Sequence, residues 1–233
     1  MNGGRKHSRR NSATGTATNP AKQRAAAFVV CSAVFAAAII FLPALTLRYW
    51  QGWLYMAILF IPMLLVMQYM LRNAPDLLER RLRMRERETQ QKKIIALSYI
   101  PFFAAYILPG FDVRLGWSNV PAWVSIAAAL VVLAGYAIVF LVFRENQYAS
   151  RVVEVEKEQS VISSGPYGAV RHPMYVGMIL LYIFSPLVLG SYWAVIPALT
   201  ILPVIVARIL NEEKVLARDL NGYPEYMQKV RYR

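Results

Sequence analysis

The sequence is poor in the residues that build disulfides, zinc sites and soluble surfaces. Its 233 residues include one cysteine, Cys31, which excludes a disulfide framework, and two histidines, His7 and His172, which are too few for a His-rich zinc site. Charged residues make up only 17% and hydrophobic residues 57%, whereas soluble domains have about 25% and about 45–50%. The composition therefore argues against a soluble or disordered protein, and no metal site is expected.

Long apolar runs without a charge account for this composition. About 20 such residues cross the hydrocarbon core of a membrane, and the runs 25–47, 52–71 and 120–143 contain 23, 20 and 24. A shorter run, 94–108, can be extended to Phe111. These runs predict about four spanning helices.

The last apolar run, 174–207, has 34 residues and is too long for one span. Gly190-Ser191 interrupts it near the middle, which predicts a helical hairpin with arms 174–189 and 191–207. The expected fold is therefore an all-α polytopic membrane bundle with about four spanning helices and a C-terminal hairpin.

The basic residues predict an orientation. Segments 1–24, 72–93, 144–173 and 208–233 carry 24 of the 26 lysines and arginines, and only Arg48 and Arg114 fall on the opposite side. Because basic loops stay in the cytosol, both termini are expected to be cytosolic. The net charge of +13 then reflects this bias and attraction to anionic lipid, and binding of nucleic acid is not expected.

The same pattern divides the chain into three regions. Residues 1–24 read as a disordered basic tail because they have little to bury. Residues 25–143 hold the transmembrane helices, with an amphipathic cytosolic loop at 72–93 that is either a helix on the membrane surface or a solvated linker. Residues 144–233 contain the hairpin, a cytosolic C-terminal helix and most of the polar residues that can carry chemistry.

Both ends of the hairpin return to the same predicted surface. Arg171, His172 and Tyr175 precede or open the first arm, whereas Arg208 and Glu212 follow the second arm and share a helix face. We expect these five side chains to gather at the membrane boundary, with Glu213 paired to a basic neighbour. Two plainer interpretations stay open: residues that anchor the spans at the interface, and a simple ion pair between Arg208 and Glu212.

The order of this cluster resembles a known family. The pattern is Gly165-Pro166-Tyr167-x-x-x-Arg171-His172-Pro173-x-Tyr175-x-Gly177, with Arg208-x-x-x-Glu212-Glu213 and Tyr223-x-x-Tyr226-x-x-x-x-Arg231 downstream. It is similar to the isoprenylcysteine carboxyl methyltransferase family, in a wider group that includes membrane phospholipid N-methyltransferases. The resemblance covers about a third of the chain, roughly residues 154–231.

The resemblance implies a membrane enzyme that uses S-adenosylmethionine without a Rossmann domain, and the sequence contains no G-x-G-x-x-G fingerprint. It places Glu212 on the cofactor and Arg208 on the methyl acceptor, and both are the expected catalytic residues. The other residues it implies around the cofactor are Gln159, Ser160, Val161, Ile162, Tyr167, Arg171, His172, Pro173, Met174 and Tyr175.

The acceptor is less clearly indicated than the cofactor. Prenylcysteine methyltransferases usually have histidine where this chain has Gln159. We expect carboxyl O-methylation of a prenylcysteine-like or other lipophilic acid that enters from the bilayer, because a guanidinium such as that of Arg208 can hold a carboxylate through two hydrogen bonds. The alternatives are N-methylation of a phospholipid amine, an NADPH-dependent membrane reductase and a non-enzymatic membrane scaffold.

Overall fold

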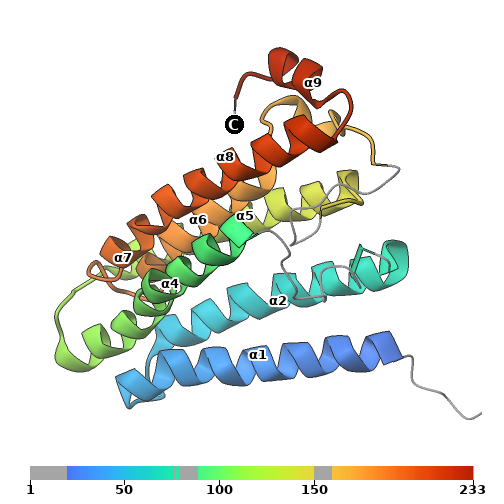
Figure 1. The fold of residues 1–233 in the computed structure, drawn as a ribbon. Helices are drawn as coiled ribbons and strands as arrows, with labels where there is room; N and C mark the ends of the chain where they lie inside the picture. Colours follow the sequence, from blue (N-terminus) through green and yellow to red (C-terminus); the bar gives the residue numbers. More distant parts are fainter. Residues whose placement is uncertain (1–19, 76, 79–88, 150–158, 233) are drawn as a thin grey trace, which may run out of the picture.

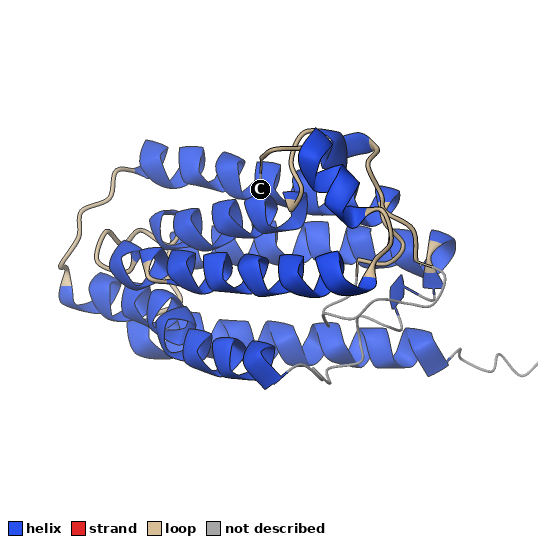
Figure 2. Cartoon of the chain, turned by 45° about the horizontal axis from the view of Figure 1, so that its top comes forward, coloured by secondary structure: helices blue, strands red, loops and turns tan. Residues whose placement is uncertain are grey.

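The structure, a computed structural model, describes residues 20–75, 77–78, 89–149 and 159–232. Throughout these residues the chain forms helices and loops and contains no strand (Figure 2). The long helices lie side by side in one elongated bundle (Figure 1). The all-α prediction without a Rossmann domain is therefore confirmed.

The helices follow the apolar runs closely. Long helices in the first part of the described chain are α1 (Pro20–Ala44), α2 (Trp50–Asn73), α4 (Thr89–Leu115) and α5 (Ala122–Glu145). The rest of the described chain forms a short 3-10 helix η1 (Gly165–Gly168) and then α6 (Pro173–Val188), α7 (Val195–Leu199), α8 (Ile201–Asp219) and α9 (Tyr223–Lys229). Four described segments are long and apolar enough to cross a membrane: Ala26–Ala44, Trp50–Asn73, Ala122–Glu145 and Val195–Asp219. The protein is thus a multi-pass membrane protein.

Two predicted boundaries were wrong. Helix α1 begins at Pro20, inside the predicted tail 1–24, because a helix can continue past its apolar run into flanking polar residues. The second hairpin arm does not end at Ala207: α8 runs on to Asp219, because no glycine or proline interrupts the chain between Val204 and Gly222. The remainder of the predicted tail and most of the predicted amphipathic loop 72–93 lie outside the described residues.

Small residues bring the hairpin close to α5. A Cβ atom on Gly177 of α6 would lie 2.8 Å from the carbonyl oxygen of Gly135 on α5, and a Cβ atom on Gly135 would lie 2.8 Å from the carbonyl oxygen of Gly177. Only glycine allows this approach of two backbones. The crossing fixes the position of α6, whose first turn carries Tyr175.

The hairpin turns at the predicted place, where Gly190 has a positive φ of 76°. The turn is held by Asp112 of α4, a buried carboxylate that accepts hydrogen bonds from the hydroxyls of Ser118 and Ser191. The Tyr49 hydroxyl also donates a hydrogen bond to the carbonyl oxygen of Leu189. This end of the bundle is therefore closed by polar contacts, and the candidate site lies at the opposite end.

Candidate active site

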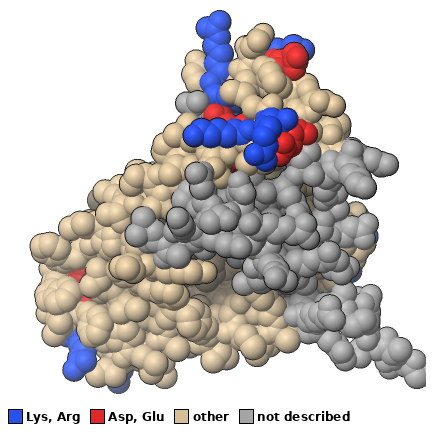
Figure 3. Space-filling view, viewed as in Figure 1, with Lys and Arg blue, Asp and Glu red and all other residues tan. Residues whose placement is uncertain are grey.

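The predicted polar residues meet where α6 begins and α8 ends. The loop before α6, the last turns of α8, and α9 lie together at one end of the bundle (Figure 1). On the face shown in Figure 3, lysines, arginines and acidic residues gather over this end, and most of the remaining described surface is uncharged. The site is therefore at the boundary between an apolar body and a charged end.

A buried ion pair lies at the centre of this end. Glu213 Oε1 lies 3.0 Å from Arg171 Nη1 and 3.2 Å from His172 Nε2. The three side chains are only 6%, 6% and 4% exposed. Because a carboxylate accepts and does not donate, His172 Nε2 carries the hydrogen of its bond to Glu213. The pairing predicted for Glu213 is confirmed.

Arg171 also ties the site loop to the C-terminal segment. Its backbone N–H donates to the carbonyl oxygen of Tyr232 at 2.9 Å, and its Nη2 donates to that of Arg231 at 3.3 Å. The Tyr226 hydroxyl donates to the carbonyl oxygen of Tyr167 at 2.7 Å. The end of the chain, from α9 to Tyr232, is thus fastened across the loop that leads into α6.

A second cluster joins α6 to α8. The Tyr175 hydroxyl donates to Glu212 Oε2 at 2.6 Å and accepts from Arg208 Nε at 2.8 Å. Tyr175 is buried, whereas Arg208 and Glu212 are half-buried. The structure confirms that the five predicted side chains lie close together: Arg171, His172, Tyr175, Arg208 and Glu212. The Tyr175 hydroxyl lies between Arg208 and Glu212, which the sequence alone would pair directly.

The adjacent residues Glu212 and Glu213 belong to different clusters. Successive residues of a helix point about 100° apart, so Glu212 contacts Tyr175 while Glu213 contacts Arg171 and His172. Glu213 is 5% exposed, and its charge is matched by that of Arg171. Glu212 is the more accessible of the two carboxylates and is the better placed to meet a ligand.

Three buried polar atoms lack a hydrogen-bond partner within the described part of the chain: Arg171 Nε, Tyr223 Oη and Asn211 Nδ2. Buried polar groups are nearly always paired. Burial, followed by the charges of Glu213 and Glu212, raises the pKa of Tyr223 above its usual value, so its hydroxyl stays neutral. The end of the bundle therefore keeps hydrogen-bonding capacity that a polar ligand can satisfy.

The other predicted cofactor residues fall into two groups. Residues 159–162 lie in the loop before η1, where Val161 packs against a cluster formed by Leu220, Tyr223 and Tyr226. Tyr167 and Met174 instead pack against a hydrophobic cluster that includes Met70 and Val142, and the Tyr167 hydroxyl accepts a hydrogen bond from Asn146. Pro173 is the buried first residue of α6. The roles of all these residues stay predictions.

Sequence reasoning did not place Tyr223 or Asn211 among the site residues, although each has a buried polar atom without a partner within the described residues, and it did not predict that Glu213 contacts both Arg171 and His172. Two features of the sequence could have drawn attention to Tyr223 and Glu213: the tyrosines that follow Gly222, and the adjacent acidic residues Glu212 and Glu213. Only the docking of α9 reveals that Tyr223 is 4% exposed and close to the glutamates.

Comparison with known proteins finds one related family. No individual curated protein sequence matches the chain. The sequence model of the family described as phospholipid methyltransferase matches residues 123–221, from the start of α5 to just beyond α8. The match includes both clusters, from Arg171 to Glu213. Over these 99 residues, less than half of the chain, the sequence is similar to the phospholipid methyltransferase family, which supports a membrane methyltransferase.

Proposed function

We propose that the protein is an S-adenosylmethionine-dependent methyltransferase that esterifies the carboxyl group of a lipophilic acid. The observation that carries the proposal is the bridge from Arg208 through Tyr175 to Glu212. It places a guanidinium and an accessible carboxylate side by side at the charged end of an apolar bundle. The family match supports methyl transfer, and the choice of cofactor and acceptor rests on these residues.

The residues at this end fit the proposed cofactor. S-adenosylmethionine, when bound, supplies an activated methyl group on a positively charged sulfur, and it also carries an amino group, a carboxylate and an adenosine. Glu212 can accept hydrogen bonds from its amino or hydroxyl groups. The unpaired atoms Tyr223 Oη and Arg171 Nε offer further polar contacts. His172 and residues 159–162 complete the proposed binding residues.

Arg208 is the proposed acceptor residue. Its guanidinium can hold a carboxylate through two parallel hydrogen bonds and so fix the direction of attack. A carboxylate is already a nucleophile, so alignment and exclusion of water are the main tasks of the site. The bond from Arg208 Nε to the Tyr175 hydroxyl fixes one edge of the guanidinium. We propose that the C-terminal segment, which Arg171 holds through hydrogen bonds to the carbonyl oxygens of Arg231 and Tyr232, helps to exclude water from the site.

N-methylation of a phospholipid amine is the second candidate, and the description of the matching family favours it. An ammonium group must lose a proton before or during methylation, so this reaction requires a base. Glu212, which already accepts a hydrogen bond from Tyr175, is the candidate base. In that case Arg208 would contact the phosphate of the lipid.

The proposed orientation places the site in the cytosol. Several basic residues lie at or near this end: Arg171, Arg208, Lys214, Arg218 and Lys229. Arg48 instead lies just before α2, and Arg114 lies in the last turn of α4, both toward the hairpin turn. The positive-inside rule then assigns the site end to the cytosol.

Calorimetric titration of the purified full chain with S-adenosylhomocysteine tests the cofactor assignment. We expect saturable binding that His172→Ala and Glu212→Ala each weaken about tenfold or more, as for loss of a hydrogen bond to a charged group. Glu225→Ala, on the exposed face of α9, is the matched control. Unchanged affinity in both site variants would reject the assignment, and saturable binding of NADPH instead would favour a reductase.

A further inference from the structure

The C-terminal end of α5 lies against the loop that leads into α6 and contacts this loop at two points. The Ser164 hydroxyl donates a hydrogen bond to Glu145 Oε2 at 3.1 Å. Three residues further along the loop, the Tyr167 hydroxyl accepts a hydrogen bond from Asn146 Nδ2 at 2.9 Å. Two adjacent residues at the end of one helix thus hold neighbouring parts of the loop that ends at His172.

Gly165 shows how closely the loop approaches α5. Its φ is 55°, in the left-handed region that favours glycine. A Cβ atom at this position would lie 2.6 Å from Glu145 Cγ and 2.9 Å from Glu145 Cδ. Any larger residue would therefore require both a strained backbone and a displaced Glu145 side chain. The loop and the end of α5 fit together closely as a result.

Asn146 has its backbone and side-chain polar groups engaged within the protein. Its backbone N–H donates to the carbonyl oxygen of Val142 at 2.8 Å, and its own carbonyl oxygen accepts from the N–H of Ala149 at 3.2 Å. Its side-chain Oδ1 accepts from the backbone N–H of Tyr148 at 2.8 Å. Because a backbone N–H can only donate, this bond determines which side-chain atom is the oxygen, and Nδ2 faces Tyr167. The side chain is therefore fixed in one orientation.

Tyr167 is held from three sides. Its ring packs against a hydrophobic cluster that includes Val142 of α5. Its hydroxyl accepts the hydrogen bond from Asn146, and its carbonyl oxygen accepts one from the Tyr226 hydroxyl of α9 at 2.7 Å. Tyr167 therefore connects α5 to α9. It lies only five residues before His172, in a loop whose turns are closed by backbone hydrogen bonds.

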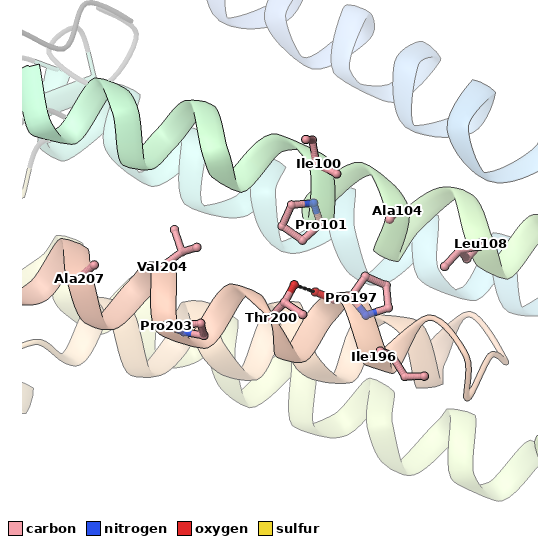
Figure 4. Close-up of a pocket in the computed structure, with 10 residues that line it drawn as sticks. All are labelled: Ile100, Pro101, Ala104, Leu108, Ile196, Pro197, Thr200, Pro203, Val204 and Ala207. Atoms are coloured by element: carbon pink, nitrogen blue, oxygen red, sulfur yellow. Dashed lines mark hydrogen bonds between the residues drawn. The ribbon is translucent and has the colours of Figure 1, made fainter.

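An apolar groove of about 730 Å³ between α4 and the α7–α8 arm lies apart from these contacts (Figure 4). Ile100 and Leu108 of α4 line one side, and Ile196 and Ala207 are among the residues that line the other side. Its described lining residues include none from α5 or from the loop 159–172. The loop is thus positioned by its contacts with α5 and α9, and not by this groove.

We propose that Asn146 is a positioning residue for the cofactor site. By donating to the Tyr167 hydroxyl, it fixes the loop from Gly165 to His172, which contains predicted contacts of S-adenosylmethionine. Because the polar groups of Asn146 are already engaged within the protein, it acts through Tyr167 and not on the ligand. This inference rests on the proposed function and adds to it a residue outside the sequence motif.

Replacement of Asn146 tests the proposal through the affinity for S-adenosylhomocysteine, measured by calorimetric titration of the purified full chain. Asn146→Leu has a similar size and removes the side-chain hydrogen bonds, so we expect binding about fivefold weaker, as for the loss of one neutral hydrogen bond. Asn146→Asp should bind within about twofold of the wild type, because a carboxylate can accept from both the Tyr148 N–H and the Tyr167 hydroxyl. Equal weakening by the two variants would overturn the proposal.

Asn73→Leu is the matched control at another helix end. Asn73 is the last residue of α2, and its Nδ2 donates to the carbonyl oxygen of Tyr69 in the same helix at 2.9 Å. We expect Asn73→Leu to leave the affinity for S-adenosylhomocysteine within about twofold of the wild type. If it weakened binding as much as Asn146→Leu, the effect would be a general one of damaged helix ends, and the positioning role would be rejected.

A double-mutant cycle with Tyr167→Phe separates positioning of the loop from a local role at the end of α5. Tyr167→Phe removes the hydroxyl and leaves the bond between the Tyr148 N–H and Asn146 in place. If Asn146 acts through this hydroxyl, Asn146→Leu should weaken binding less than about twofold in the Tyr167→Phe background. The same fivefold loss in both backgrounds would assign Asn146 a local role only and contradict the proposal.

Hydrogen exchange without ligand, measured by mass spectrometry, distinguishes a failure of the positioning role from a failure of the proposed function. Asn146→Leu should raise the exchange rate of loop amides such as Ala169 and Val170 about threefold or more, and Asn73→Leu should not. This result in a protein that does not bind S-adenosylhomocysteine would reject the proposed function and leave the hold of Asn146 on the loop. Saturable binding that Asn146→Leu does not weaken, with unchanged exchange, would reject the positioning role and leave the proposed function.

Discussion

Glu212 and Glu213 are neighbours in sequence, yet the structure predicts opposite effects when each is replaced by glutamine. Glu213 is 5% exposed and is bonded to Arg171 and His172, whereas Glu212 is half-buried and accepts a hydrogen bond from Tyr175. Glutamine keeps the shape of the side chain and removes its charge. The pair of variants therefore separates a charge needed for folding from a charge needed for binding.

Glu213→Gln leaves the guanidinium of Arg171 buried without a counter-charge. Removing one partner of a buried ion pair costs about 3–5 kcal/mol. For a chain of this size, about 1 kcal/mol shifts the melting temperature by roughly 2–4 °C, so we expect a fall of roughly 6–20 °C. Glu212→Gln keeps an oxygen that can accept from Tyr175. We expect it to lower the melting temperature by under about 4 °C, corresponding to about 1 kcal/mol, and to weaken S-adenosylhomocysteine about tenfold or more.

A double variant shows whether the ion pair is the cause. Arg171→Met with Glu213→Met removes both charges, so no buried charge is left without a counter-charge. It takes a partner from the His172 N–H, a loss of about 1–3 kcal/mol, and from the carbonyl oxygen of Arg231, an exposed residue whose carbonyl can bind water instead. It should therefore melt above Glu213→Gln. The assay is thermal unfolding in detergent, followed by tryptophan fluorescence. The reasoning would be refuted if the double variant melted at a lower temperature than Glu213→Gln, or if Glu212→Gln and Glu213→Gln melted at the same temperature.

Four further predictions concern other parts of the molecule. Arg208→Lys should lower kcat/KM about 100-fold and leave S-adenosylhomocysteine affinity within twofold, because lysine keeps the charge but not the planar fork; near-normal turnover in a methyl-transfer assay would reject the acceptor role. Gly177→Ala should lower the free energy of unfolding by about 1–3 kcal/mol, because its Cβ atom would lie 2.8 Å from a backbone oxygen of α5. As a control in the same melting assay, Gly168→Ala should lower it less, because the nearest atom to its Cβ is a backbone oxygen at 3.3 Å. Asp112→Asn should lower the free energy of unfolding by about 1–3 kcal/mol, because it removes the charge of a carboxylate that accepts hydrogen bonds from two serine hydroxyls and a backbone N–H. Cofactor affinity should not change, and a change in it would contradict the separation of the two ends of the bundle. In a Cys31→Ser background, a cysteine at exposed Trp193 should react with an impermeant thiol reagent from outside and one at Lys229 only after permeabilisation; the reverse pattern would invert the proposed orientation.

Much of the helical layout could be predicted because a long apolar run without a charge is typical of a membrane-spanning helix and of few other structures. The runs 52–71 and 120–143 each match one helix to within two residues at both ends. The hairpin could be predicted equally well, because a glycine in the middle of the last apolar run can supply the positive φ that a tight turn requires, and Gly190 does so. An antiparallel hairpin then brings the start of one arm beside the end of the other. For this reason the meeting of Tyr175 with Arg208 and Glu212 could be predicted as well.

The rest of the site depends on contacts that local patterns do not encode. Which of Glu212 and Glu213 faces inward depends on the rotation of α8 against α6, and neighbouring helical residues differ by only about 100°. The burial of Tyr223 depends on how the C-terminal segment docks across the site loop. Neither of these features leaves a periodic signal in the sequence.

Methyl transfer by the purified full chain in proteoliposomes tests the central claim most directly. The vesicles are given methyl-labelled S-adenosylmethionine and either a single-tailed acid, such as an S-farnesylated N-acetylcysteine, or phosphatidylethanolamine. The account predicts label in the acid that mild alkali releases as methanol, because a methyl ester hydrolyses and an N-methyl group does not. Alkali-stable label in phosphatidylethanolamine alone would establish the phospholipid alternative, and no transfer to either acceptor would contradict the account.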